Sequence, residues 1–362
     1  VKGIRVVKSF VREDFEINKF DETSNDIREM FTRAEQIIAL NNPLMQISIY
    51  AVMLFVLMFG SEMIIKTNGT SLDVGQLSTL MTYGFQIMVS LMMLSMVFVM
   101  ITFSEESCKR IVEVLNEKSS ITSKKNAITE VKDGSIDFDH VRFKYSPTAE
   151  RPVLENIDVH IKSGETIGII GGTGSAKSSF VQLIPRLYDV TEGTVRVGKE
   201  DVRDYDLVTL RDSVAMVLQK NVLFSGTIAD NIRWGNKDAT LEEVKHVCHL
   251  ACADEFIEQM PDGYDTWIEQ GGTNVSGGQK QRLCIARALL KQPKILIMDD
   301  STSAVDTKTD AIIRKAMREY IPETTKIIIA QRTSSVEDAD RIIVLDGGQI
   351  DAIGTSEELL KT

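Results

Sequence analysis

Charged side chains are absent from two long stretches of this 362-residue sequence. No Asp, Glu, Lys or Arg occurs from Gln36 to Ser61 or from Val74 to Ser104. Each stretch exceeds the roughly 20 residues that an α-helix needs to cross a bilayer, so we predict membrane helices at about 42–65 and 74–103. Two buried helices of a soluble core are the alternative, but such cores rarely need charge-free runs of this length.

Basic residues are scarce in the short loop between the two stretches. The loop runs from Lys66 to Asp73, has Lys66 as its one basic residue, and contains the turn residues Asn68 and Gly69. The two predicted helices therefore form a hairpin with both outer ends on one side of the membrane. Those ends carry the remaining nearby basic residues, which are Lys8, Arg12, Lys19, Arg28, Arg33, Lys109 and Arg110. Because basic residues mark cytoplasmic flanks, we expect a multi-pass protein of the cell membrane with these ends in the cytoplasm.

The sequence also lacks an excess of positive charge and has few cysteines. It has 41 Lys and Arg against 52 Asp and Glu, a formal net charge of -11, which argues against a nucleic-acid partner. The four cysteines form no Cys-x-x-Cys pair and fit a reducing cytoplasm. Cys248 and Cys252 lie near His246 and His249 in an amphipathic stretch, but without the spacing of a zinc site, so we expect no metal there.

The chain divides into two regions of different character. Residues 1–118 are predicted to form part of a membrane domain, with charged helical residues on both sides of the spans. A linker rich in Ser, Lys and Asp follows at 119–134, and residues 135–362 alternate short β-rich runs with helical stretches, an α/β pattern. The predicted strands are Ile136–Tyr145, Thr166–Ile170, Val214–Leu218, Ile295–Met298, Lys326–Ile329 and Ile342–Leu345. The chain starts inside a charged segment without a signal peptide, so we expect a piece of a longer protein.

A glycine-rich turn follows the predicted strand Thr166–Ile170, and a helix is expected to start near Lys177. Glycines let successive amides face an anion, and the helix N-terminus adds positive potential. We therefore predict a triphosphate site in which Lys177 binds phosphate and Ser178 binds Mg²⁺, although Ala176 replaces the second glycine of the pattern G-x-x-x-x-G-K-[ST]. The predicted nucleotide-binding residues of this loop are Gly171, Gly172, Thr173, Gly174, Ser175, Ala176, Lys177, Ser178 and Ser179.

Two further motifs fit the same chemistry. The run Ile295–Asp300 reads as a buried strand that ends in two carboxylates, and Asp299 is the expected second Mg²⁺ ligand. Solvated charges at a strand end are the alternative. A Ser-Gly-Gly turn within Val275–Arg282 feeds a helix whose first amides are free to bind an anion, although Ser276 alone would explain an ordinary helix cap.

In order and spacing, these motifs resemble ABC transporters, specifically type IV exporters, over nearly the whole chain. The resemblance implies an α/β P-loop NTPase of the ABC type behind the last two helices of a six-helix membrane domain, with ATP and Mg²⁺ as cofactors. It assigns adenine stacking to Tyr145, the Q-loop and a Mg²⁺ contact to Gln219, the X-loop acid to Glu269 and Walker B to Asp299. The signature consists of Val275, Ser276, Gly277, Gly278 and Gln279, the D-loop of Ser303 to Asp306, and the coupling segment of residues 1–13.

Three residues depart from the family pattern around one γ-phosphate. Asp300 stands where the catalytic glutamate is expected, Gln331 where the switch histidine is expected, and Ala176 where a glycine is expected. Aspartate is one methylene shorter, whereas a base must come within about 2.6–3.2 Å of its water. Glutamine cannot carry the proton of an imidazole. We therefore expect slow hydrolysis at a catalytic set of Asp300, Gln331 and Gln219.

The nearly intact signature implies a second half-transporter as partner. In this family, the signature contacts the nucleotide of the facing subunit, so this chain would complete a partner site with full Walker motifs in a heterodimer. The predicted function is ATP-driven export of an unknown small molecule, in contact with membrane lipid. A structural or regulatory ABC subunit with little turnover is the alternative, and the spans argue against a soluble ABC clamp. The methionines of the second span would adapt to apolar ligands, but helix packing explains them as well.

Overall fold

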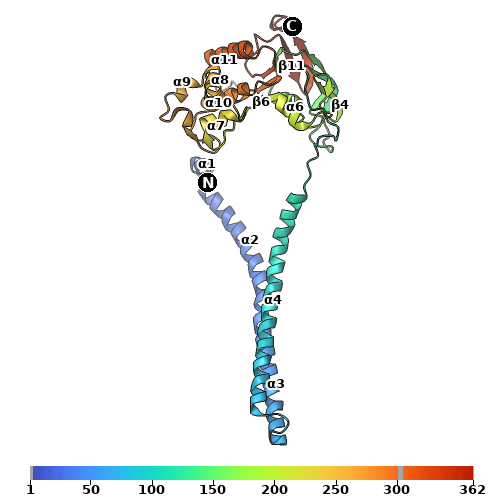
Figure 1. The fold of residues 1–362 in the computed structure, drawn as a ribbon, viewed down its shortest axis with the longest axis vertical. Helices are drawn as coiled ribbons and strands as arrows, with labels where there is room; N and C mark the ends of the chain where they lie inside the picture. Colours follow the sequence, from blue (N-terminus) through green and yellow to red (C-terminus); the bar gives the residue numbers. More distant parts are fainter. Residues whose placement is uncertain (1–2, 301–304, 362) are drawn as a thin grey trace. The chain divides into compact units, whose positions relative to one another are not determined.

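A computed structural model describes residues 3–300 and 305–361 (Figure 1). The chain separates into two compact units between Lys118 and Ser119. The first unit is helical, and the second contains the sheets. Each unit is described by itself below.

The first unit consists of four helices. They are α1 (Ile4–Ser9), α2 (Glu13–Ala39), α3 (Asn41–Thr67) and α4 (Val74–Asn116). Helices α3 and α4 run side by side as a hairpin, in which Asn41 Nδ2 donates a hydrogen bond of 2.8 Å to Ser95 Oγ. The turn between them uses left-handed Asn68, with φ of +48°, and a capping box of Asp73 and Gln76.

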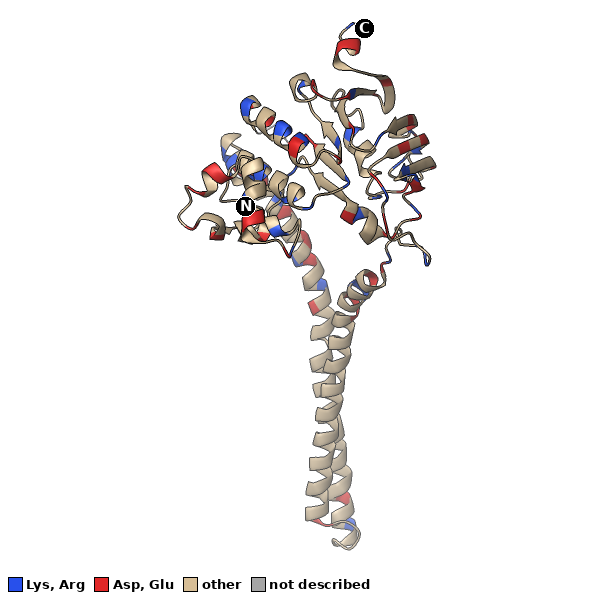
Figure 2. Cartoon of the chain, turned by 45° about the horizontal axis from the view of Figure 1, so that its top comes forward, with Lys and Arg blue, Asp and Glu red and all other residues tan. Residues whose placement is uncertain are grey.

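The hairpin is long and apolar enough to cross a membrane. Its middle lacks charged residues, whereas α2 carries many, as Figure 2 shows. In the most apolar window of each span, only 6% and 0% of the residues are buried. Helices of a soluble core would be buried, so this exposure favours two membrane helices over that alternative. The helices include the predicted spans 42–65 and 74–103, and α4 continues as a polar helix beyond Ser104.

The second unit is built on a six-stranded, mostly parallel sheet. Its strand order is β12-β11-β3-β10-β9-β6, and β12 is the one antiparallel member. The strands are β3 (Thr166–Ile170), β6 (Val214–Val217), β9 (Ile295–Asp299), β10 (Thr325–Ile329), β11 (Arg341–Asp346) and β12 (Gln349–Gly354). A four-stranded antiparallel sheet has the order β2-β1-β4-β5 and comprises β1 (Ile136–Phe143), β2 (Leu154–Ile161), β4 (Glu192–Val197) and β5 (Glu200–Asp201). The short strands β7 (Gly226–Thr227) and β8 (Trp267–Ile268) pair with each other.

Helices cover this unit, and its buried apolar residues form two large clusters and one small one. They are α5 (Lys177–Gln182), α6 (Leu207–Ser213), α7 (Ile228–Arg233), α8 (Leu241–Leu250), α9 (Asp254–Ile257), α10 (Gly277–Leu290), α11 (Thr307–Tyr320) and α12 (Ser356–Leu359), with 3₁₀ turns η1 (Gly263–Asp265) and η2 (Thr333–Ser335). Along β9, Ile295 and Ile297 join one apolar cluster, while Leu296 and Met298 join the other. This alternation explains why β9 reads as a continuous apolar run, since both faces of the strand are buried.

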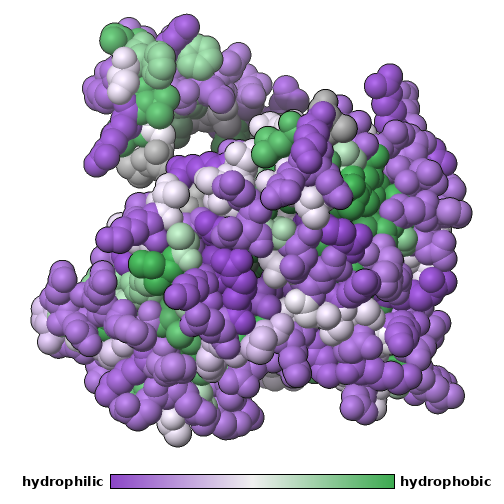
Figure 3. Space-filling model, turned by 90° about the horizontal axis from the view of Figure 1, so that it is seen from above, coloured by the Kyte–Doolittle hydropathy of each residue, from purple (hydrophilic) through white to green (hydrophobic). Residues whose placement is uncertain are grey.

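The residues predicted as a linker lie against the second unit. Ile128 forms a parallel bridge with Tyr205, Ser123 Oγ donates to Asp206 Oδ1 at 2.9 Å, and Val131 is buried. Chain segments on both sides of Ser135 therefore pack into one unit. The face shown in Figure 3 is predominantly hydrophilic, with separate hydrophobic patches, as expected for a water-exposed domain.

Candidate nucleotide-binding site

Four segments that are distant in sequence meet at one edge of the parallel sheet. Strands β3, β10, β9 and β6 are neighbours and parallel, so their carboxyl ends lie at the same edge. Gly171 follows β3, Gln331 follows β10, Asp299 and Asp300 end β9, and Gln219 follows β6. Ligands of open α/β sheets bind outside this edge. The structure thus brings together the residues for which sequence analysis predicted phosphate chemistry.

The loop after β3 places a lysine against its own backbone. Lys177 Nζ donates hydrogen bonds to the carbonyls of Gly171 at 2.8 Å and Gly172 at 2.7 Å, and to Ser175 Oγ at 3.2 Å. Gly171 adopts φ of +154°, and a Cβ there would lie 2.1 Å from the carbonyl oxygen of Leu345. Only glycine fits this close approach. The ammonium is held at the loop, where it can bind a phosphate.

Ala176 occupies a backbone conformation that favours glycine. It is the N-cap of α5 and adopts φ of +71° and ψ of 19°, in the left-handed region. An L-residue with a Cβ costs roughly 1–2 kcal/mol more there than glycine does. The replacement of the second glycine therefore keeps the geometry of the loop but strains it.

Ala176→Gly is expected to relieve this strain. The free energy of unfolding should rise by about 1 kcal/mol, because glycine adopts positive φ without a steric cost and loses part of this gain to its own chain entropy. We also expect ATP to bind several-fold more tightly, since the strained loop then adjusts to the phosphates more easily. Titration of the full-length protein with a fluorescent ATP analogue measures this change. Ala149→Gly, outside the loop, is the control, and equal affinities for the original chain and Ala176→Gly would contradict the prediction.

The three predicted catalytic residues form one hydrogen-bonded cluster. Asp300 Oδ2 accepts hydrogen bonds from Gln219 Nε2 at 3.2 Å and from Gln331 Nε2 at 2.7 Å. Asp300 is nearly buried, with 9% exposed, and its φ is +49°. Its amide donates to the carbonyl of Ile329 at 3.0 Å, which ties the end of β9 to β10. One carboxylate oxygen is therefore shared by two side-chain amides.

The neighbouring carboxylate suits a divalent cation. Asp299 is 5% exposed, and burial together with the charge of Asp300 raises its pKa, while Ser178 and Lys177 oppose the shift. A desolvated carboxylate beside a hydroxyl offers the oxygen ligands that Mg²⁺ prefers. Ser178, Asp299 and Gln219 remain the predicted ligand set, and the positions of Ser178 and Asp299 fit it.

This raised pKa predicts pH-dependent Mg²⁺ binding. The proton and the cation compete for Asp299, so lowering the pH through the pKa of this carboxyl should weaken Mg²⁺ binding, by up to about tenfold per pH unit below the pKa. Mg²⁺ titrations of the ATP-loaded full-length protein, over a pH series that descends from 7.5, measure the effect. Asp299→Asn should bind Mg²⁺ weakly and with a flatter pH profile, whereas an equally steep profile in this variant would refute the assignment.

Tyr145 lies beside the start of α5 with half of its surface exposed. Its hydroxyl and Ser179 Oγ are hydrogen-bonded at 2.8 Å, and its ring meets the rings of Phe143 at 4.8 Å and Tyr188 at 5.0 Å edge-on. The residue is 51% exposed, so part of its ring is open to solvent. This ring can stack on a base while its hydroxyl fixes its position next to the loop.

The predicted signature lies at the start of α10 and faces a different group of helices. Ser276 and Gln279 form a capping box, with Gln279 N donating to Ser276 Oγ at 3.3 Å and Ser276 N to Gln279 Oε1 at 2.9 Å. Gly277 and Gly278 begin the helix, and Val275 packs at the edge of the second apolar cluster. Helix α10 packs on α7, α8 and β6.

The remaining predicted residues serve as caps and loop supports. Asp306 caps α11 and accepts from Thr309 N at 3.0 Å, and this bond lowers the pKa of Asp306. Thr273 Oγ1 donates to the carboxylate of Glu269. The predicted D-loop residue Ser303 and the first two residues of the coupling segment lie outside the described residues, and α1 contains the centre of that segment.

Sequence analysis did not predict a group of buried hydrogen bonds that holds the segment after Gln219. The side chain of Asn231 is 1% exposed and bonds both the amide and the carbonyl of Phe224 at 2.9 Å. Arg287 of α10 donates to Asn231 Oδ1 at 3.0 Å and to the carbonyl of Val222 at 3.2 Å. The segment after Gln219 is thus fastened to the signature helix. The residue types around Asn231 did not predict these hydrogen bonds, because they depend on side-chain geometry.

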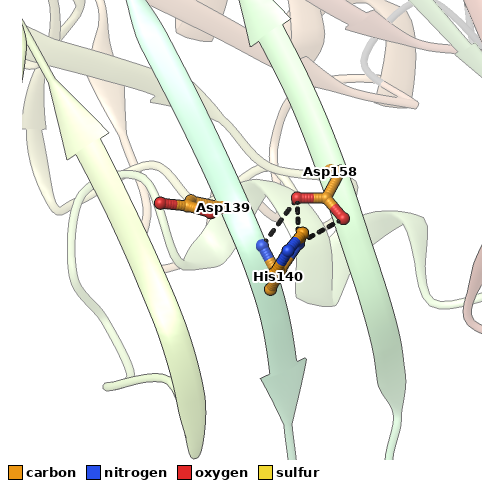
Figure 4. A group of neighbouring side chains, drawn as sticks. All are labelled: Asp139, His140 and Asp158. Carbon is orange, nitrogen blue, oxygen red and sulfur yellow. Dashed lines mark hydrogen bonds and ion pairs between the residues drawn. The ribbon is translucent and has the colours of Figure 1, made fainter.

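Among the described residues, Asp139, His140 and Asp158 lie close enough to hold a metal ion outside this edge, but they have other partners. Figure 4 shows that His140 and Asp158, from β1 and β2, point at each other, and Nδ1 of His140 lies 2.6 and 2.7 Å from the two carboxylate oxygens. This pair raises the pKa of His140, while Asp139 points elsewhere and pairs with Arg196 at 3.2 Å. All three residues of the group are exposed, and their contacts are those of surface ion pairs.

The Cys and His side chains around α8, where no metal is expected, also have separate partners. His249 Nδ1 lies 2.5 Å from Asp254 Oδ2, and His246 meets the ring of Tyr320 edge-on. Burial raises the pKa of Cys248 to about 12, which favours the thiol over the thiolate that binds metals.

Comparison with known proteins identifies both regions of the chain. Residues 154–303 match the family described as ABC transporter, and residues 1–92 match the ABC transporter transmembrane region. An uncharacterized ABC transporter ATP-binding protein of Bacillus subtilis is 36% identical over 362 residues, which are 100% of this chain and 61% of the relative. The ATP-dependent lipid A-core flippase of Photobacterium profundum is 34% identical over 362 residues, with the same two coverages.

A solved structure of a bacterial Atm1-family ABC exporter with ATP bound is also similar. Its TM-score is 0.89 at 30% identity, and the match covers 99% of this chain and 62% of that chain. The chain thus spans about three fifths of the length of the relatives that it matches. Its apolar helices cross the membrane, and its α/β unit is a cytoplasmic ATP-binding domain. The chain therefore belongs to the ABC transporters and combines, as exporters do, part of the transmembrane region with the ABC ATPase domain.

Proposed function

We propose that this chain binds ATP in an exporter, hydrolyses it slowly at its own site, and completes the ATP site of a partner subunit. The observation that carries the proposal is the cluster in which Gln219 and Gln331 both donate to Asp300 Oδ2. The oxygen that would accept a proton from the attacking water already accepts two hydrogen bonds. These two hydrogen bonds occupy the oxygen and direct the carboxylate toward the two side-chain amides instead of toward a water.

Geometry and charge at this cluster both lower the expected rate. Aspartate ends one methylene short of glutamate, and a misplacement of about 1 Å can cost on the order of a hundredfold in rate. Gln331 offers one neutral amide in place of an imidazole, and that amide donates to Asp300 at 2.7 Å. Mg²⁺, when bound, neutralises charge on the β- and γ-phosphates. Lys177 and the loop amides would hold the triphosphate without any contact to Asp300. ATP binding therefore does not depend on the residue that limits hydrolysis.

The signature supports the proposed role in a partner site. Gly277 and Gly278 start a helix of 14 residues, and their free amides and the helix dipole favour a phosphate at this end. We infer a partner half-transporter with a complete Walker site that faces this end of α10. Two copies of this chain would hold two slow sites, so a heterodimer explains the sequence better than a homodimer does.

We infer an apolar or lipid-like molecule as the exported substrate. A groove of about 900 Å³ in the first unit is lined mostly by apolar side chains, including Met53, Met92, Met93 and Met96. Methionine side chains adapt to varied apolar shapes. The name of the similar lipid A-core flippase points in the same direction. The proposal fails if the purified transporter shows an ATPase response to polar solutes and none to hydrophobic compounds.

A structural or regulatory subunit with little nucleotide turnover is the second candidate, and the strained Ala176 favours it. The experiment that separates the two candidates is ATP binding by the full-length protein, measured with radiolabelled ATP and Mg²⁺. The proposed function predicts bound ATP that remains mostly unhydrolysed after the bound fraction has reached equilibrium. Absent binding that Ala176→Gly restores would favour the structural subunit, and rapid release of phosphate would contradict the slow site.

A further inference from the structure

A network of ion pairs, buried at Asp310 and Arg314, joins α11 to the segment that follows Gln331. Asp310 and Arg314 lie one turn apart on α11, are 3% and 8% exposed, and pair at 3.3 Å between Nε and Oδ2. Ser335 of η2 donates to the same Asp310 Oδ2 at 3.2 Å. Arg314 Nη1 also donates to Asp338 Oδ2 at 2.8 Å. Arg318 Nη2, one turn further along α11, donates to the same Asp338 oxygen at 3.3 Å. Three side chains of α11 thus hold two residues of the segment 331–340.

Burying the Asp310–Arg314 pair costs free energy, which indicates that the network does more than stabilise the fold. Asp310 Oδ1 has no hydrogen-bond partner among the described residues. Buried ion pairs give little net stability, because the cost of removing both charges from water offsets their attraction. Arg314 Nε likewise has no hydrogen-bond partner among the described residues, although it lies 3.3 Å from Asp310 Oδ2. The directional hydrogen bonds from Ser335 to Asp310 and from Arg314 to Asp338 nevertheless fix the positions of the groups that they join.

The same segment is also fixed against β3, the strand that leads to the phosphate loop. Val336 is 1% exposed and packs on Gly168, where an added Cβ would lie 2.6 Å from the Cβ of Val336. Asp340 Oδ2 accepts a hydrogen bond of 2.7 Å from the amide of Thr166. Residues 335–340 are therefore held between α11 and β3. Gln331 lies four residues before this fixed segment, with its Nε2 2.7 Å from Asp300 Oδ2.

We propose that Asp310, Arg314 and Asp338 are positioning residues that hold Gln331 at the γ-phosphate. The inference rests on the proposed function, because it requires ATP at the loop 171–179. Helix α11 begins directly after Asp306 of the predicted D-loop, so the network connects that loop to Gln331 through one rigid helix. A movement of the D-loop against a partner subunit would then reposition Gln331.

The test compares the affinities for ATP and ADP in the full-length protein in lipid nanodiscs. Gln331 can donate to the γ-phosphate, which ADP lacks, so a displaced Gln331 lowers the affinity for ATP alone. For Arg314→Met, we expect the Kd for ATP to rise about fivefold, the effect of one lost hydrogen bond, and the Kd for ADP to stay within about twofold. Arg314→Lys, which keeps the charge, should recover part of the loss. Lys315→Met is the matched control on the exposed face of α11, where Lys315 pairs only weakly with Glu319 at 3.9 Å, and should change neither Kd.

A double-mutant cycle shows whether Arg314 acts through Gln331. In Gln331→Ala, the added Arg314→Met should leave the Kd for ATP unchanged. The inference is overturned if the Kd values for ATP and ADP rise together, if neither changes, or if Arg314→Met has its full effect without Gln331. If Arg314→Met does not fold, Asp338→Asn, whose side chain is 54% exposed, replaces it with the same expected pattern. Failure of the unaltered protein to bind either nucleotide would instead refute the proposed function.

Discussion

The double substitution Asp300→Glu with Gln331→His is expected to raise ATP hydrolysis at this chain's own site on the order of a hundredfold. Glutamate extends the carboxylate by one methylene toward the attacking water, and histidine removes the amide that donates to Asp300 Oδ2 at 2.7 Å. Histidine can also donate a hydrogen bond to the γ-phosphate, as inferred for Gln331, so the Kd for ATP should change little. Single-turnover hydrolysis by the full-length protein measures the rate.

Two single substitutions separate the contribution of the longer side chain at position 300 from that of the lost hydrogen bond to it. Asp300→Glu alone should give a smaller gain, because Gln331 still donates to the carboxylate. Gln331→His alone should raise the hydrolysis rate little, because the aspartate side chain remains one methylene short. The control Asp300→Asn keeps the size of the side chain but removes the base, and should hydrolyse no faster than the original chain. An equal rate for the double substitution and Asp300→Asn would refute the role of this cluster.

Gly277→Asp is expected to reduce the ATPase activity of the assembled transporter on the order of a hundredfold. The new carboxylate would stand at the first position of α10, against the γ-phosphate of the partner's ATP. Two charges about 4 Å apart repel by roughly 4 kcal/mol in a partly buried site, which is sufficient for such a loss. An acidic residue in the first turn of a helix stabilises that helix by about 0.3–1 kcal/mol, so the domain itself should fold as well as before.

The matched control for this prediction is Gly277→Asn. Asparagine has nearly the same shape as aspartate but no charge, and it should retain most of the activity. Steady-state ATPase assays of both variants, each assembled with the same partner, supply the comparison. Similar losses in both variants would show that size rather than charge matters. Full activity of Gly277→Asp would mean that this end of α10 faces no phosphate.

Sequence periodicity predicted β1 and five of the six strands of the central sheet, but missed β12 and several strands outside that sheet. Each of the six predicted runs overlaps an observed strand, because apolar residues line both faces of strands such as β9. The antiparallel strands β2 and β4 were missed. Their sequences alternate buried and exposed positions, as in LENIDVHI, and are interrupted by polar residues, so periodicity alone gave a weak signal. The linker prediction rested on composition, which does not reveal that Ile128 pairs with Tyr205.

Motif spacing predicted which residues meet at the sheet edge, but not how they contact one another. The pairing of β3, β10, β9 and β6 places the predicted Gln219, Asp300 and Gln331 together. The sequence indicated that Asp300 is short, but not that two amides share its Oδ2, since hydrogen-bond partners depend on side-chain geometry. Similarly, the substitution at Ala176 was visible, whereas its left-handed backbone was not. The roles of these residues in binding and hydrolysis remain predictions.

The most direct test of the slow site follows the fate of the γ-phosphate in each subunit. The assembled transporter is loaded with photoreactive ATP labelled with ³²P at either the α- or the γ-position, allowed one turnover, cross-linked and separated into its two chains. We predict that this chain retains most of its γ-label relative to its α-label, while the partner loses its γ-label. Equal loss of γ-label from both chains would contradict the account.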